Sequence, residues 1–334
     1  MKLLYFSCHS ILEYDECKLF TELGVDWFSM GSYVVPTSPV DSIRPPIRYY
    51  PDQWLTENTP PRDKLTPEFL SRFDTVIVMH VPEWIEENWD KFRGKRVIWR
   101  TIGQSTPAIE RRMLKYRQKG LQILRYSPRE ANLDPSAGCD KLIRFYKDPK
   151  EFGKWVGAGN EVITFAQDMK HRGQFCNYDA FVEITQGFNT KVYGPKNETS
   201  GDLNGGFLTY AEMQQKLRDA RVYIYTGTQP ASYVLNLLEA MMTGVPVVAI
   251  GPQLGNSLSY KNNINADLYE VPDIITNGVN GFWSDNIKEL RERVDFLLSD
   301  VKSARRIGEM GRQRAIELFD KGKIKEQWRE FLKI

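Results

Sequence analysis

Strand-sized apolar segments alternate with helical segments along most of this chain, and no other feature restricts its fold as strongly. Residues 75–79 read Thr-Val-Ile-Val-Met, β-branched and apolar without interruption, as a strand covered on both faces would be. Residues 96–99 repeat the pattern after a segment with helical spacing at 83–92. Parallel strands joined by right-handed helical crossovers form a doubly wound sheet. The pattern therefore predicts an α/β fold.

The alternation occurs twice, on either side of a polar segment with several glycines near residue 155. Strands are expected at 2–6, 75–79, 96–99, 161–165, 191–193, 222–225 and 245–250, and helices at 13–23, 83–92, 177–186, 210–219, 233–242 and 287–298. The chain has 334 residues, more than the roughly 250 that one core supports. We therefore predict two Rossmann-like doubly wound domains facing a cleft, residues 1–155 and 156–318.

Residues 36–61 are rich in prolines and aromatics, and we expect them to form a long irregular loop. Its Tyr49, Tyr50 and Trp54 either stack on a bound ligand or pack against one another.

Charge, the length of apolar runs and cysteine spacing limit the location and the binding sites that we expect. The 45 Lys and Arg against 43 Asp and Glu leave a net charge of +2, which neither demands nor excludes a nucleic-acid partner. The apolar runs are shorter than the roughly 20 residues that cross a bilayer, and the first one is too short for a signal peptide, so a cytoplasmic location is expected. The four cysteines have no C-x-x-C spacing, so neither a zinc site nor a disulfide framework is predicted.

Several ligand-binding motifs are absent from the sequence. No G-x-G-x-x-G follows a strand, since Gly157-Ala158-Gly159 precedes one, and there is no Walker A motif. Asp-x-Asp, which holds a metal ion in many single-domain sugar transferases, is also missing. We therefore expect no bound metal and no tightly bound cofactor.

The segment from Tyr225 to Ala249 carries the clearest functional signal. A strand ends there in a turn, Thr226-Gly227, that leads into a helix, so free backbone N–H groups and the helix dipole favour an anion at the carboxyl end of the strand. Glu239 lies within that helix, and a carboxylate there can accept hydrogen bonds from both hydroxyls of a ribose. The spacing suits a nucleotide.

This segment resembles the donor-binding core of GT-B glycosyltransferases of family 4. It matches the family pattern Glu-Ala-Met-x-x-Gly-x-Pro-Val-Val-Ala at residues 239–249, and residues 269–282 are similar to Gly-Val-Pro-Glu-Ile-Ile followed by Asp-Gly-x-Asn-Gly-Phe. The resemblance covers mainly residues 210–282, with a weaker match at 161–194. It implies two GT-B domains, the second of which binds a nucleotide sugar.

The resemblance also implies which residues bind the donor. The family has a second glutamate eight positions before Glu239, and this chain has Ala231 there, so Gln229, Ser232 or Tyr233 would supply the polar contacts to the sugar. Arg172 fits the place of the family's diphosphate-binding Lys, with Lys170 nearby. The expected donor-binding residues are Lys170, Arg172, Thr226, Gly227, Gln229, Ser232, Tyr233, Val234 and Glu239.

In the amino-terminal domain, His80 and Arg100 follow two strands that resemble those facing the acceptor in the family. With Arg172 they are the predicted catalytic residues, and Arg100 would act by hydrogen bonding because arginine cannot serve as a base. His9, Glu13 and Asp15, in and after the first loop, are candidate acceptor contacts. The resemblance implies a retaining mechanism in which the departing phosphate takes the acceptor proton.

Residues 319–334 are amphipathic, with Ile324, Trp328 and Phe331 at helical spacing. The resemblance implies that this helix packs back on the amino-terminal domain. A membrane-surface helix is the alternative, because lysines accompany the apolar stripe.

Together these features predict a glycosyltransferase that moves a hexose from a UDP- or GDP-sugar to a hydroxyl of a glycan, a lipid-linked sugar or another acceptor. One alternative is a GT-B enzyme that glycosylates hydroxymethylated bases in DNA, for which the basic residues are Arg44, Arg48, Lys115, Arg117 and Lys119. Another is a non-catalytic nucleotide-sugar binder. A dehydrogenase is disfavoured by the missing glycine fingerprint.

Overall fold

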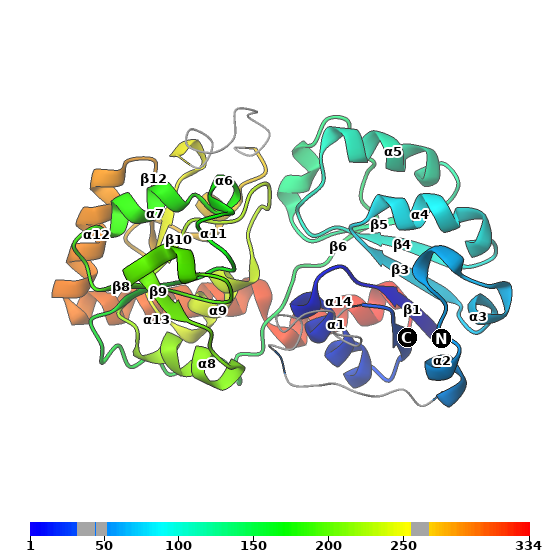
Figure 1. The fold of residues 1–334 in the computed structure, drawn as a ribbon, viewed down its shortest axis with the longest axis horizontal. Coiled ribbons are helices and arrows are strands. Elements are labelled where there is room, and N and C mark those ends of the chain that lie inside the picture. Colours follow the sequence, from blue (N-terminus) through cyan, green and yellow to red (C-terminus); the bar gives the residue numbers. More distant parts are fainter. Residues whose placement is uncertain (32–43, 45–51, 255–266) are drawn as a thin grey trace. The chain divides into compact units, whose positions relative to one another are not determined.

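The computed structural model describes residues 1–31, 44, 52–254 and 267–334. The chain divides into two compact units (Figure 1). The N-terminal unit contains Met1–Arg144 and Ile324–Ile334, and the C-terminal unit contains Phe145–Lys323. Each unit has a six-stranded sheet in which neighbouring strands are parallel. The predicted α/β class with two Rossmann-like sheets is confirmed.

The sheet of the N-terminal unit has the strand order β2-β1-β3-β4-β5-β6. Its strands are β1 (Lys2–Phe6), β2 (Asp26–Ser29), β3 (Thr75–Met79), β4 (Arg96–Arg100), β5 (Gln122–Arg125) and β6 (Lys141–Leu142). Its helices are α1 (Ser10–Glu22), α2 (Gln53–Glu57), α3 (Pro67–Ser71), α4 (Pro82–Asn88), α5 (Pro107–Arg117) and most of α14 (Lys321–Leu332). The direction of winding reverses between β1 and β3, so the loops after these strands flank the topological switch point.

Alternate residues of these strands are buried on opposite faces of the sheet. On one face Leu4, Phe6, Val76, Val78 and Trp99 join a cluster that includes residues of α3, α4 and α5. On the other face Tyr5 meets Phe20 of α1 edge to face at 5.8 Å. Both faces are therefore covered, which explains why the strand sequences are apolar throughout.

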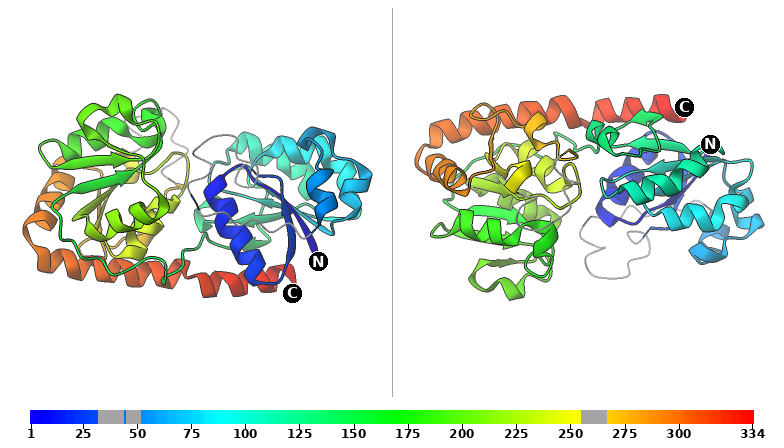
Figure 2. Two further views of the ribbon diagram at one scale, coloured as in Figure 1. Left: turned by 60° about the horizontal axis from the view of Figure 1, so that its bottom comes forward. Right: turned by 90° about the horizontal axis from the view of Figure 1, so that it is seen from above.

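Helix α14 covers the same face as α1 (Figure 2). Trp328 is fully buried, and its ring lies 5.1 Å from that of Phe20 in a T-shaped pair. At its rim, Lys325 pairs with Glu22 at 3.3 Å and Lys141 pairs with Glu330 at 2.6 Å. None of the helices in the described ranges is long and apolar enough to cross a bilayer.

The sheet of the C-terminal unit has the order β12-β11-β10-β7-β8-β9. Its strands are β7 (Val162–Phe165), β8 (Thr190–Tyr193), β9 (Asn204–Gly206), β10 (Val222–Tyr225), β11 (Val247–Ile250) and β12 (Phe282–Ser284). The helices are α6 (Gly173–Cys176), α7 (Tyr178–Thr185), α8 (Tyr210–Asp219), α9 (Leu235–Thr243), α11 (Val271–Ile274), α12 (Ile287–Ser299) and α13 (Val301–Phe319). Here the switch point lies between β7 and β10.

Two predicted elements differ from the structure for identifiable reasons. Residues 36–61 do not form an irregular loop throughout, because Gln53–Glu57 is a helix capped by the Asp52 side chain, which accepts from Leu55 N at 3.4 Å. Trp54 lies in this helix with the Arg72 guanidinium 3.9 Å from its ring, whereas Tyr49 and Tyr50 lie outside the described residues. The first helix starts at Ser10 rather than residue 13, because His9 Nδ1 accepts from Leu12 N.

Candidate functional site

The carboxyl ends of β7 and β10 bring two predicted donor-binding loops together in the C-terminal unit. Thr226 Oγ1 donates to Cys176 O at 2.6 Å, and Asn177 Nδ2 donates to Thr226 O at 2.8 Å. Gln229 N donates to Phe175 O at 2.8 Å. The loop after β10 is thus fixed to the segment that follows β7, at the place where open α/β sheets bind ligands.

A small pocket opens between this loop and the carboxyl end of β11. Gly227 has a φ of +73°, and a side chain at this position would be strained. Tyr269 forms another side of the pocket, and its hydroxyl donates to Ile250 O at 2.9 Å. The lining residues are Asn177, Thr226, Gly227, Thr228, Gln229, Ala231, Ile250, Gly251, Pro252 and Tyr269. Thr226, Gly227 and Gln229 are predicted donor contacts, and Ala231 occupies the place of the family's glutamate.

Helix α9 begins beside this pocket without a side-chain cap. Val234 is its N-cap residue, and Val234 N donates to Tyr225 Oη at 3.1 Å. In the first turn, Asn236 Nδ2 donates to Phe165 O at the end of β7 at 2.6 Å, while no described residue bonds its buried Oδ1. Sequence reasoning missed Asn236, although a polar residue among the leucines of an apolar helix is a visible signal. An uncapped helix start at a switch point favours an anion.

Arg172 and Lys170 point to different neighbours. Arg172 is the N-cap of α6, and its Nη1 donates to Gln167 O at 3.2 Å. Burial raises the pKa of the nearby Cys176 thiol, and the positive charge of Arg172 opposes that rise. Lys170 is exposed, with Nζ 3.1 Å from Thr199 O. Arg172 is therefore the cation nearer to the loop that carries Thr226.

Glu239 is buried in α9 and forms an ion pair with Lys147. Lys147 Nζ lies 2.8 Å from Glu239 Oε1, and both residues are less than 5% exposed. Lys147 is held in turn by its backbone N, which donates to Phe319 O at 3.0 Å. This pairing could not be predicted from local sequence, because the two residues lie far apart in the chain.

Tyr233 and Ser232 lie inside the C-terminal unit. Tyr233 is fully buried between Phe145 and Phe319, with ring centroids 5.9 and 5.3 Å away. Ser232 is also fully buried, and its carbonyl accepts from Glu270 N at 3.0 Å. Contact of either side chain with a donor sugar stays a prediction.

At the switch point of the N-terminal unit, the loops after β1 and β3 bring His9 and His80 to the same edge of the sheet. Ser7 Oγ lies 3.6 Å from Met79 Sδ, and His9 N donates to Ser7 Oγ at 3.2 Å. His80 has a φ of +60° and a half-buried side chain whose Nδ1 meets no hydrogen-bonding group of the described chain. Burial lowers the pKa of His80 below its ordinary value, so its imidazole is neutral near pH 7.

Glu13 and Asp15 are buried in α1 rather than exposed at the edge. Glu13 Oε1 accepts from Ser29 Oγ at 2.5 Å, and Gly31 packs so closely on this carboxylate that a Cβ there would lie 2.0 Å from Oε2. Asp15 is 8% exposed. Glu13 therefore holds the chain at Ser29 and Gly31, at the end of β2.

Arg100 is fully buried beneath the N-terminal sheet edge. Its Nε pairs with Glu16 at 3.0 Å, and its Nη1 donates to Ile143 O at 2.7 Å. The guanidinium also lies 5.6 Å from the Trp328 ring. Arg100 therefore belongs to an interior charge network, and its contact with a substrate stays a prediction.

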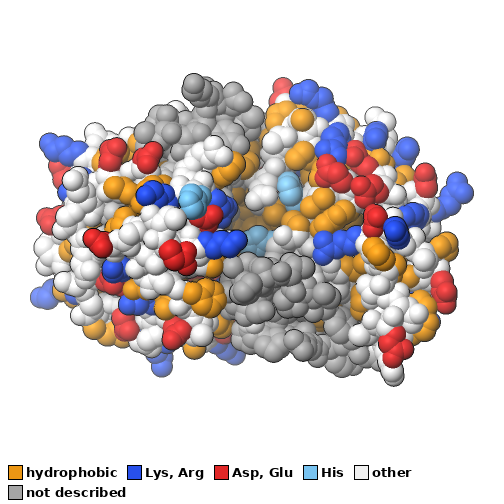
Figure 3. Space-filling model, in the orientation of Figure 1, with side chains coloured by type: hydrophobic (Ala, Val, Ile, Leu, Met, Phe, Trp, Pro, Cys, Tyr) orange, Lys and Arg blue, Asp and Glu red, His pale blue; other side chains and the backbone are white. Residues whose placement is uncertain are grey.

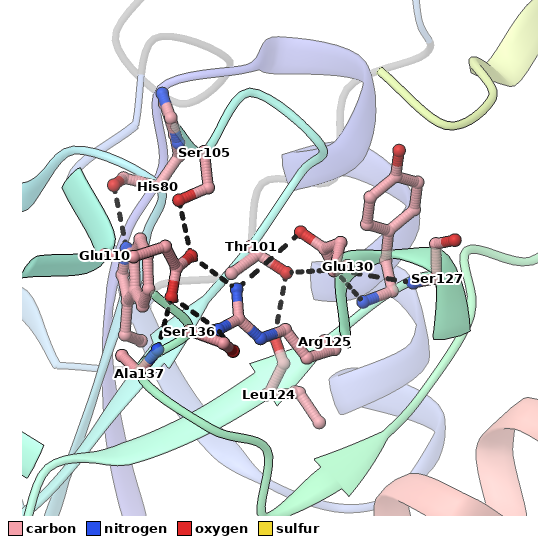
Figure 4. Close-up of polar contacts among 12 residues, drawn as sticks. His80, Thr101, Ser105, Glu110, Leu124, Arg125, Ser127, Glu130, Ser136 and Ala137 are labelled. Atoms are coloured by element: carbon pink, nitrogen blue, oxygen red, sulfur yellow. Dashed lines mark hydrogen bonds and ion pairs between the residues drawn. The ribbon is translucent and has the colours of Figure 1, made fainter. Parts of the chain in front are cut away.

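A second buried network lies below the loops after β4 and β5 (Figure 4). Arg125 donates to both oxygens of Glu110, at 2.8 and 2.7 Å, and its Nη1 lies 3.9 Å from Glu130 Oε1. Burial raises the pKa of Glu130, whose Oε2 accepts from Thr101 Oγ1 at 2.7 Å. These residues were not predicted, because single charged residues in a sequence do not reveal that they are buried together.

The basic residues weighed for DNA binding that the structure describes are buried or contact side chains of their own unit. Lys115 and Lys119 lie over the Tyr116 ring, and Arg117 pairs with Asp140. Arg44 is 6% exposed, and Arg48 lies outside the described residues. On the face shown in Figure 3, positive and negative side chains are interspersed over each unit.

The described part of the chain contains no group of three or more His, Cys, Asp and Glu side chains placed to hold a metal ion.

Solved structures share this fold over nearly the whole chain. Sucrose-phosphate synthase from Thermosynechococcus elongatus matches with a TM-score of 0.69 at 13% identity, covering 100% of this chain and 98% of that one. HepE from Anabaena, solved with UDP-glucose, matches with a TM-score of 0.64 at 13% identity, covering 100% and 99%. A glycosyltransferase from Rickettsia africae matches with a TM-score of 0.66 at 12% identity, covering 99% and 97%. No family model and no curated protein sequence matches the chain. The chain is thus similar in fold to these proteins, and the expected GT-B fold is confirmed.

Proposed function

We propose that this GT-B chain is a glycosyltransferase that transfers a hexose from a nucleotide diphosphate sugar to an acceptor hydroxyl. The observation that carries the proposal is the site at the β7/β10 switch point, where a pocket, an uncapped helix start and a cation lie together. HepE, which shares the fold, was solved with UDP-glucose, and this supports a UDP-sugar as the donor.

We assign the three parts of a nucleoside diphosphate to three features of the C-terminal unit. In this proposal the base lies beside the small pocket lined by Gly227 and Tyr269. The start of α9 and Arg172 meet the diphosphate, since backbone N–H groups and a guanidinium both stabilise phosphate charge. Glu239 accepts hydrogen bonds from the ribose hydroxyls, and its ion pair with Lys147 holds the carboxylate in place.

The acceptor binds, in this proposal, at the carboxyl edge of the N-terminal sheet with His80 and His9. A neutral imidazole with an unpaired Nδ1 can accept a hydrogen bond from a sugar hydroxyl or donate one to it. Arg172 and the start of α9 stabilise the charge that develops on the departing diphosphate, so no metal ion is required. Retention follows if that diphosphate takes the acceptor proton on the same face.

The test of the nucleotide site is calorimetry with UDP and GDP on Glu239→Gln. We expect at least a tenfold loss of affinity for the nucleotide that the wild-type chain binds, because a neutral amide accepts hydrogen bonds less strongly than a carboxylate. The matched control is Glu161→Gln, which breaks a partly buried pair with Lys216 at the opposite edge of the same sheet. Unchanged affinity for both nucleotides in Glu239→Gln would rule out the assignment.

A second candidate function is nucleotide-sugar binding without transfer, and the observation that favours it is Ala231. This residue lines the pocket at the position where the resemblance places a glutamate near the donor sugar. Incubation with UDP-glucose or GDP-mannose separates the two functions. A transferase releases free nucleotide slowly even without an acceptor, whereas a binder releases none.

A further inference from the structure

The main chain of His80 adopts a conformation that residues with a side chain seldom take. Its φ of +60° lies in the left-handed region, directly after β3 and at the switch point of the N-terminal sheet. Such a conformation persists where the surroundings impose it, and it is concentrated at functional sites.

Two hydrogen bonds from the end of β4 fix this conformation. His80 N donates to Arg100 O at 2.9 Å, and Trp99 Nε1 donates to His80 O at 2.7 Å. Both polar groups of the His80 peptide backbone are therefore bound to β4. The second bond depends on a side chain and can be removed by substitution.

The Trp99 indole is itself fixed by its surroundings in the N-terminal unit. It is fully buried, and the Arg125 guanidinium lies 5.4 Å from its ring. Arg125 cannot move away because it makes two parallel hydrogen bonds to Glu110 (Figure 4). Glu110 is fixed in turn by Ser105 Oγ at 2.5 Å and Ala137 N at 2.7 Å. A continuous set of contacts thus runs from Glu110 through Arg125 and Trp99 to the His80 carbonyl.

The side chain of His80 is left with an open polar atom. Nδ1 is buried and has no partner in the described part of the chain. The charged residue that most affects this imidazole is Glu83 of α4, which is itself paired with Arg112 of α5 at 2.6 Å. A buried nitrogen without a partner is costly unless a ligand supplies one.

We propose that Trp99, supported by the Arg125–Glu110 pair, is a positioning residue that holds the His80 main chain so that its imidazole can hydrogen-bond a substrate hydroxyl. The part of this inference that concerns substrate rests on the proposed function. The part that concerns the geometry of His80 does not.

The first test follows His80 directly in Trp99→Phe, which removes the Nε1–H donor and keeps an aromatic ring. The chain has only three histidines, so the imidazole signals in NMR spectra can be assigned with His80→Asn. We expect the pKa of His80 to rise towards the ordinary value of about 6.5 in Trp99→Phe, because the released loop exposes the ring to water. The same titration in Trp99→Phe as in wild type would overturn the proposal.

The matched control is Trp27→Phe. Trp27 is a buried tryptophan in β2 of the same sheet, its Nε1 donates to Thr21 Oγ1 at 2.9 Å, and β2 is not adjacent to β3, the strand that precedes His80. We expect it to leave the His80 titration unchanged. An equal shift in both variants would show a general loosening of the unit and would count against the proposal.

If Trp99→Phe does not fold, Arg125→Lys is the second variant. It keeps the positive charge beside Glu110 but loses the guanidinium group next to the Trp99 ring and one of the two parallel hydrogen bonds. The expected shift of the His80 titration has the same direction and is smaller. No shift in a folded Arg125→Lys would overturn the support role of Arg125.

The second test is a double-mutant cycle on sugar transfer. We expect Trp99→Phe and His80→Asn each to lower kcat/KM for the acceptor by about tenfold or more, and the double variant to be no worse than His80→Asn alone. If the losses of kcat/KM in the two single variants multiply in the double variant, Trp99 acts independently of His80, which would contradict the proposal. UDP affinity should stay unchanged in Trp99→Phe. If the wild-type chain transfers no sugar, the proposed function fails, while the NMR titration still decides the geometry.

Discussion

At the scale of single residues, the ion pair between Lys147 and Glu239 is important for the stability of the C-terminal unit. Their ion pair is almost completely buried, so each charge depends on the other for stabilisation. We predict that Lys147→Met lowers the free energy of unfolding of the C-terminal unit by about 3–5 kcal/mol, because it leaves a buried carboxylate without a cation. Chemical denaturation measures this loss.

Two comparisons check the reason for that loss. The double variant Lys147→Met, Glu239→Met should recover much of the stability, since no buried charge then remains. Lys141→Met breaks the exposed pair with Glu330 and should cost at most about 1 kcal/mol. Equal losses from Lys147→Met and Lys141→Met would contradict the burial argument.

His80 makes stability depend on pH in a defined direction. Its pKa in the folded chain is lowered by burial, so between that value and about 6.5 the unfolded chain binds a proton that the folded chain does not. Stability should therefore fall as the pH falls through about 6.5, and this part of the fall should disappear in His80→Asn. Urea unfolding at a series of pH values would show it, and an identical pH dependence in both proteins would contradict it.

The elements illustrate what can be predicted from sequence and what cannot. The strands β3, β4 and β10 are visible as apolar runs because each is covered on both faces of its sheet. Helix α2 is not visible, since the surrounding prolines suggest irregular structure and the cap at Asp52 is a local detail. The turn into α9 is recognisable from its Thr-Gly sequence.

The orientation of side chains at strand ends was harder to predict than the strands. Arg100 ends β4 next to Met79 and Leu124, and it was predicted to face a substrate. Its partners within the chain, Glu16 and the Ile143 carbonyl, come from segments that are distant in sequence, and this burial was not predicted. Ion pairs between distant elements depend on tertiary packing, so no local pattern reveals them.

Helix α14 provides a prediction for one element. Trp328 is fully buried against Phe20, so Trp328→Ala should destabilise the N-terminal unit by about 3–5 kcal/mol. Phe331→Ala, on the same helix but only partly buried, should cost clearly less. Hydrogen exchange of β1 and α1 peptides reports the difference, and equal effects of the two variants would contradict the role assigned to Trp328.

For the whole molecule, the two switch points predict which strands and helices a bound nucleotide stabilises. A ligand at 100 times its dissociation constant stabilises the state that binds it by about 2.7 kcal/mol. UDP should therefore slow hydrogen exchange in β10 and α9 of the C-terminal unit. Peptides from β1 and β3 should change little without an acceptor. If UDP slows hydrogen exchange only in β1 and β3, the nucleotide binds the N-terminal unit, and the proposed donor site is contradicted.

The division of the chain also affects how the protein is made. The N-terminal unit contains the first 144 residues and the last 11 of this sequence, with the whole C-terminal unit between them. A ribosome that adds 5–20 residues per second needs roughly 10–40 s to pass from the first part to the second. Through that interval the hydrophobic surface formed by Phe20 has no Trp328 to cover it. The nascent chain therefore lacks this contact until α14 is made, and a transcript that stops before α14 encodes an N-terminal unit without the helix that covers Phe20.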